Sequence, residues 1–106
     1  MLPQLLAMLA DPNGTVRASG AHALSVFGKK SAPAFEPLRA LLGDPAPLVR
    51  TYAAVALGAM GKTAAPALPE LLAMQKERDY RVSGAARKAV SQIRGRPSPA
   101  RTLGAY

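Results

Sequence analysis

The chain has 106 residues, of which 49% are hydrophobic and none is cysteine. This content excludes a generally disordered chain, and the apolar runs are far shorter than the ~20 residues of a membrane-spanning helix. Lysine and arginine total 14 against 6 acidic residues, and the net charge of +8 would attract nucleic acid, anionic lipid or an acidic protein. Without cysteines or a basic signal segment, we expect a cytoplasmic protein.

The first 33 residues predict a pair of helices. Residues 2–10 are almost entirely apolar and carry no charge, and residues 11–14 (Asp-Pro-Asn-Gly) have turn chemistry. Over residues 16–27, apolar or small residues recur every three or four positions, which is typical of one face of an α-helix. Gly28 stands where a C-cap is expected, and Ser31 can cap the helix that follows.

The same pattern returns 33 positions later. Asp11-Pro12 and Val16-Arg17 recur as Asp44-Pro45 and Val49-Arg50, and a third, diverged copy follows. A period of this size indicates stacked supersecondary units. We therefore predict an all-α fold, an α-solenoid of three stacked helical hairpins forming an α-α superhelix. The expected boundaries are repeats at about 1–33, 34–66 and 67–95, then a flexible, basic and proline-containing tail at 96–106.

The middle copy carries the fullest motif. From Leu38 to Gly61 it reads Leu-x-x-Leu-Leu-x-Asp-Pro-x-x-x-Val-Arg-x-x-Ala-x-x-Ala-Leu-Gly-x-x-Gly. This motif resembles the short HEAT repeat found in phycobilisome lyase subunits and many bacterial scaffold proteins. The resemblance, over about residues 2–94, implies a right-handed solenoid whose second helices line the concave face. The third copy departs from it at Glu77, Ser83 and Arg94.

Repeated aspartates and arginines form the most conspicuous charged columns. The arginines could present their charge to an anionic ligand, or they could bridge turn carbonyls and the aspartate of their own or the adjacent unit. The structural interpretation is favoured because turns in stacked hairpins leave carbonyls that need donors. The expected ladder residues are Asp11, Arg17, Asp44 and Arg50.

A second row of residues lies opposite the apolar face of each second helix. Helical geometry places it on a solvent-exposed stripe of mostly small residues, which either admits a partner's helix or strand or is merely solvated. We expect a non-catalytic scaffold or adaptor that binds a protein or peptide there. The candidate residues are His22, Ser25, Lys29, Thr51, Val55, Gly58, Lys62 and Lys88.

Basic residues cluster in the third copy. They could bind nucleic acid or another polyanion through phosphate contacts, or they could be the polar end-cap that the last repeat of a solenoid needs. The cap is favoured, because Tyr80 is the sole aromatic residue near them for base stacking. The residues concerned are Arg81, Arg87, Lys88, Arg94 and Arg96.

The sequence contains no grouping that indicates catalysis, a metal or a cofactor. His22 is the only histidine, and the acidic residues fall mostly in turns or near helix starts. We therefore expect no enzyme. The resemblance also allows an accessory role in a bilin lyase-like assembly, but no residue singles it out.

The uncharged first helix lacks the polar outer face of a terminal repeat. We expect either flanking repeats of a longer array or self-association to cover it, since each buried leucine contributes roughly 1.5–3 kcal/mol. The leucines concerned are Leu2, Leu5, Leu6 and Leu9.

Overall fold

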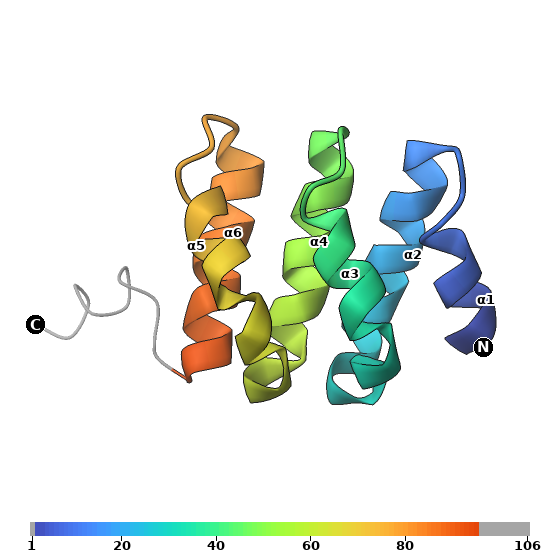
Figure 1. Cartoon of the computed structure of the whole chain (residues 1–106), viewed down its shortest axis with the longest axis horizontal. Coiled ribbons are helices and arrows are strands. Elements are labelled where there is room, and N and C mark those ends of the chain that lie inside the picture. Colours follow the sequence, from blue (N-terminus) through green and yellow to red (C-terminus); the bar gives the residue numbers. More distant parts are fainter. Residues whose placement is uncertain (1, 96–106) are drawn as a thin grey trace, which may run out of the picture.

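The computed structural model describes residues 2–95, and these form three helical hairpins in a row (Figure 1). The predicted tail at 96–106 lies outside the described residues. No strand occurs between residues 2 and 95. The α-helices are α1 (Leu2–Met8), α2 (Gly14–Phe27), α3 (Phe35–Leu41), α4 (Pro47–Ala59), α5 (Leu68–Met74) and α6 (Tyr80–Arg94), and 3-10 helices at Gly28–Ala34 and Gly61–Ala67 join the hairpins.

The helices form two layers with different spacing. The second helices α2, α4 and α6 pack extensively on one another, whereas the first helices α1, α3 and α5 contact mainly their own hairpins. A glycine permits a close approach within this layer: a Cβ on Gly58 of α4 would lie 2.9 Å from the Cα of Ala89 on α6. The layer of α2, α4 and α6 is thus the more closely packed one, as expected for the inner side of a solenoid, and its outward-facing surface is called the concave face below. The all-α solenoid is therefore confirmed.

The core follows the repeat columns. Leucines of the first helices, Leu5, Leu38 and Leu71, are all buried, as are Leu24 and Leu57 of the second helices. No hairpin can bury its apolar stripe alone. Neighbouring hairpins cover one another's stripes, and the buried residues form one continuous core.

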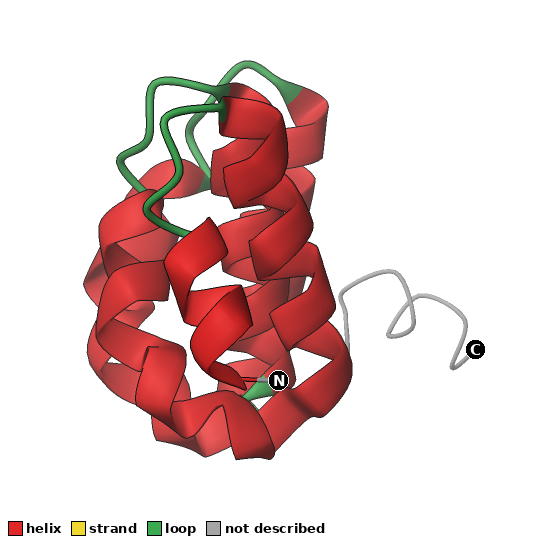
Figure 2. Ribbon diagram, turned by 90° about the vertical axis from the view of Figure 1, so that its right-hand side faces the viewer, coloured by secondary structure: helices red, strands yellow, loops and turns green. Residues whose placement is uncertain are grey.

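Turns between the helices of each hairpin gather at one end of the molecule (Figure 2). The side chain of Asn13 caps α2 by accepting a hydrogen bond from the Thr15 amide, and Asp79 caps α6 through the Arg81 amide. At the opposite end, Gly28 has φ of +54°, a conformation that L side chains rarely adopt.

The expected N-cap role of Ser31 is wrong. A 3-10 helix follows Gly28 directly, and within it the hydroxyl of Ser31 is fully buried and donates to the carbonyl oxygen of Leu24 at 2.7 Å. The serine therefore ties the connecting segment back to α2, and α3 begins at Phe35 without a side-chain cap.

The first helix also differs from expectation. Leu5 and Leu9 are buried against α2, where a Cβ on Gly20 would lie 3.4 Å from a methyl of Leu9, so these two leucines cannot form a self-association surface. Leu2 and Leu6 are half-buried and pack on the same core. A seven-residue helix has so little surface that pairing with α2 covers most of its apolar side chains.

Candidate binding surface

A shallow hollow lies on the concave face, across the three second helices. Its volume is about 140 Å³, and its walls are mainly apolar. The stripe residues Ser25, Val55 and Lys88 contribute to it from α2, α4 and α6, so the structure brings three of the predicted residues together. The complete lining is Ser25, Val55, Ala59, Ala85, Lys88 and Gln92.

Three of these lining residues were not predicted: Ala59, Ala85 and Gln92. Residues 59 and 92 occupy the same repeat position, four residues or about one helical turn beyond Val55 and Lys88. They line the hollow because each second helix also exposes a flank between itself and its neighbour. The 33-residue register could have found them if the stripe had been drawn one position wider.

Other stripe residues lie around the hollow rather than in it. His22 is exposed on α2 and stacks on Tyr52 of α4, with ring centroids 4.8 Å apart and ring planes at 26°. Thr51 is half-exposed, and its hydroxyl donates to the carbonyl oxygen of Pro47. Lys29 and Lys62 are exposed at the starts of the two 3-10 helices.

The predicted exposure of Gly58 is wrong. Gly58 is buried between α4 and α6, where an added Cβ would meet Oε1 of Gln92 at 2.4 Å and the Cα of Ala89 at 2.9 Å. The helical wheel of α4 alone places this residue opposite the core. It omits the next unit, whose helix α6 covers that position. Gly58 is therefore a packing residue and no part of the binding stripe.

The arginines of the repeat connect each hairpin to the next. Arg17 donates through Nε and Nη2 to both carboxylate oxygens of Asp44, at 2.8 and 3.2 Å, and through Nη1 to the carbonyl oxygens of Asp11 and Pro12. Arg50 repeats this arrangement one unit later with Glu77. Both guanidinium groups are thus hydrogen-bonded within the turns, and neither arginine lines the hollow.

Asp44 is the most enclosed acidic group of this ladder, with 8% of its surface exposed. Burial alone would raise its pKa. Hydrogen bonds from Arg17 and from the backbone amide of Ala46, together with the charges of Arg17 and Arg50, outweigh burial and hold the pKa of Asp44 below its ordinary value. Asp11 has a different role, since its side chain accepts from the amide of Asn13 within its own turn.

The basic residues of the third unit do not form one compact cluster. Arg81 and Arg94 lie at opposite ends of α6, about 20 Å apart at 1.5 Å per residue, and Arg81 pairs with Asp79. Arg87 occupies the repeat position that fully buried Ala54 fills in the second unit, so it faces the end of the described array. Lys88 alone among them lines the hollow. Arg96 lies outside the described residues.

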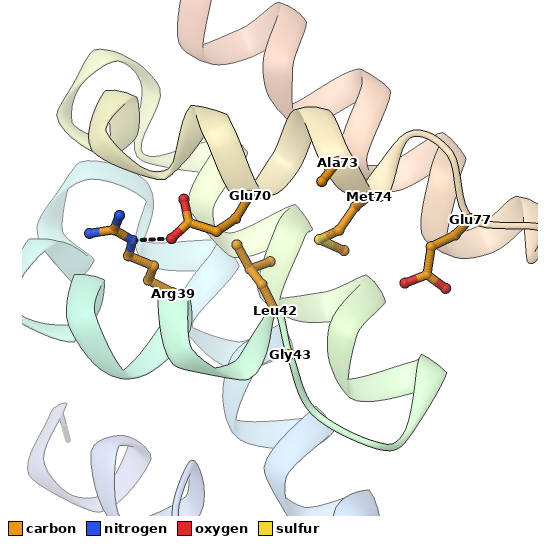
Figure 3. A pocket seen from close by; sticks show the side chains of 7 residues that line it. All are labelled: Arg39, Leu42, Gly43, Glu70, Ala73, Met74 and Glu77. Atoms are coloured by element: carbon orange, nitrogen blue, oxygen red, sulfur yellow. Dashed lines mark hydrogen bonds and ion pairs between the residues drawn. The ribbon is translucent and has the colours of Figure 1, made fainter.

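A larger hollow of about 300 Å³ opens on the outer face between α3 and α5, where the first helices stand apart (Figure 3). Arg39 and Glu70 bridge it, with Nε donating to the carboxylate at 2.5 Å. That hydrogen bond is the main reason that the pKa of Glu70 lies below its ordinary value. A third charged residue of the lining, Glu77, binds Arg50. Since these charges already pair within the chain, this hollow is the weaker candidate.

Within residues 2–95, no three His, Cys, Asp or Glu side chains converge as a metal site would require. No helix in that range is long and apolar enough to cross a membrane.

A family model for HEAT repeats matches residues 2–101, which is most of the chain. No curated protein matches.

Proposed function

Since this chain belongs to the HEAT-repeat family, whose members generally act as non-catalytic scaffolds for protein–protein interaction, we propose that it is an adaptor that docks a segment of a partner protein on its concave face. One observation carries this proposal: the apolar hollow there draws its lining from all three second helices. Such a site exists only when the three hairpins are stacked.

The size and composition of the hollow fit a side chain of a docked segment. A volume of about 140 Å³ is close to the ~150 Å³ of an engineered apolar cavity that accepts benzene. Ala59 and Ala85 contribute only methyl groups to the lining, and these small side chains leave room for an inserted group. Apolar anchors in pockets of this kind usually contribute most of the binding energy of an interface.

A capture experiment with matched variants tests the proposal. Val55→Glu places a charge on the wall of the hollow, whereas the control Ala40→Glu places the same charge on the exposed outer surface of α3. We expect proteins retained by the wild type to be retained by Ala40→Glu and lost with Val55→Glu, with circular dichroism unchanged in both variants. Retention by Val55→Glu would contradict docking at the hollow.

A further inference from the structure

Acidic residues are confined to one layer of the solenoid and its turns, whereas basic residues occur in both layers. The segments that form the concave layer and its 3-10 extensions, residues 14–34, 47–67 and 80–94, contain no acidic residue. All acidic residues lie in the first helices or in the turns that follow them. They are Asp11, Glu36, Asp44, Glu70, Glu77 and Asp79.

Most of these acidic groups are already neutralised. Asp44, Glu70, Glu77 and Asp79 each pair with an arginine. Three of these arginines belong to the concave layer, but its lysines are not among the partners. Among the described residues, no ion pair involves Lys29, Lys62 or Lys88. The concave side therefore carries positive charge without a counter-charge on its own helices.

These lysines lie near the apolar hollow. Lys88 lines it. Lys29 lies beyond one end of it, since a Cβ on Gly28 would approach the carbonyl oxygen of Ala59, a lining residue, to 3.3 Å. The Cε atom of Lys29 comes within 3.8 Å of a Cβ position on Gly61, next to Lys62. Lys88 thus lines the recess, while Lys29 and Lys62 lie just beyond the ends of α2 and α4, near Ala59 at one end of it.

We propose that the concave face selects an acidic peptide segment, with one apolar side chain seated in the hollow and flanking carboxylates opposite Lys88, Lys62 and Lys29. This proposal deepens the proposed function and rests on it. Charge complementarity of this kind steers encounter and rejects basic partners.

An acidic protein segment fits this surface better than a nucleic acid does. Single-stranded nucleic acid needs free aromatic faces on which bases stack. On this surface His22 and Tyr52 stack on each other, and the recess is lined by aliphatic and small side chains. An apolar recess flanked by cations suits a peptide that offers both a hydrophobic group and carboxylates.

Fluorescence anisotropy with defined probes tests the selectivity. The first probe is a labelled peptide with one leucine flanked by glutamates, the second has glutamines in their place, and the third is a single-stranded oligothymidine. The variant is Lys88→Glu, and its matched control is Arg87→Glu, the adjacent exposed cation that faces the end of the array. We expect the wild type to bind the acidic peptide at least about tenfold more tightly than the other probes. Lys88→Glu should weaken that binding about tenfold, and Arg87→Glu should weaken it much less.

Three outcomes would overturn the inference. Equal losses in Lys88→Glu and Arg87→Glu would show attraction by overall net charge. Tighter binding of oligothymidine would assign the face to nucleic acid. Equal binding of the glutamate and glutamine peptides, both abolished by Val55→Glu, would reject acidic selectivity while leaving docking at the hollow intact. Binding of the glutamate peptide that Val55→Glu does not change would instead reject the proposed function itself.

Discussion

Single small residues determine how closely the second helices approach. Gly58 has no side chain, and the backbone of α6 occupies the space in which a Cβ would otherwise lie. Gly84, on α6, is also within a helix, but no atom lies within 4 Å of a Cβ added to it. Two helical glycines in one protein thus have opposite packing environments.

We expect Gly58→Ala to lower the free energy of unfolding by about 1–3 kcal/mol, because the backbone of α6 must move. Gly84→Ala should raise it by about 0.5–1 kcal/mol, because alanine loses less backbone entropy in a helix. Urea denaturation of both variants measures the two changes. A stabilised Gly58→Ala would show that α4 and α6 are not in the close contact described.

The contrast between these glycines also marks how far sequence reasoning could go. The 33-residue period predicted the hairpins and the buried leucine columns, because both follow from spacing along one chain. It misplaced Gly58 on an exposed stripe, because coverage by the next hairpin depends on the distance between helices. That distance is a property of several units together, and no single column of the repeat reports it. Ala59, Ala85 and Gln92 were missed for a simpler reason, because the predicted stripe was drawn one position too narrow to include the flank of each second helix.

At the scale of elements, α2 and α4 are each coupled to the following hairpin through one arginine. The guanidinium of Arg17 or Arg50 binds two carbonyl oxygens of its own turn and a carboxylate of the next turn. Glutamate replaces aspartate at position 77 and still accepts two hydrogen bonds. The motif alone made Glu77 look like a departure, although its carboxylate serves the same role.

This coupling predicts a pH dependence. Because the pKa of Asp44 is lowered in the folded state, its stabilising contribution is complete above its unfolded pKa of about 3.9 and is lost as the pH falls through the folded value. We expect Asp44→Asn to lower the free energy of unfolding by about 1.5–3 kcal/mol at neutral pH. The difference from wild type should shrink on acidification below about pH 4. Denaturation of both proteins across this range measures it, and a constant difference would contradict the pairing.

At the scale of the whole molecule, the stability of each hairpin depends on its contacts with the neighbouring hairpins. The helix α4 packs against α2 on one side and α6 on the other, whereas α1 packs mainly on α2. In a solenoid the stability of a unit is approximately its own term plus those of its interfaces with adjacent units. The middle unit therefore has the greatest support.

Hydrogen–deuterium exchange with mass spectrometry tests this gradient. We expect amides of α4 to exchange most slowly and those of α1 most quickly among the helices of residues 2–95, because opening α1 disrupts a single interface. Gly58→Ala should accelerate exchange in α4 and α6 more than in α1. Equal protection of α1 and α4 would indicate that the array unfolds as one cooperative block.

The unequal spacing of the two layers has a mechanical consequence. Contact between α4 and α6 at Gly58 makes the inner layer nearly incompressible, while α3 and α5 are separated by a hollow that Arg39 and Glu70 span. If the curvature of the stack changes, we expect the hairpins to rotate about the closely packed inner helices. The gap between α3 and α5 would then widen or narrow. The Arg39–Glu70 ion pair spans that gap, so a widening of the outer layer would have to lengthen or break it.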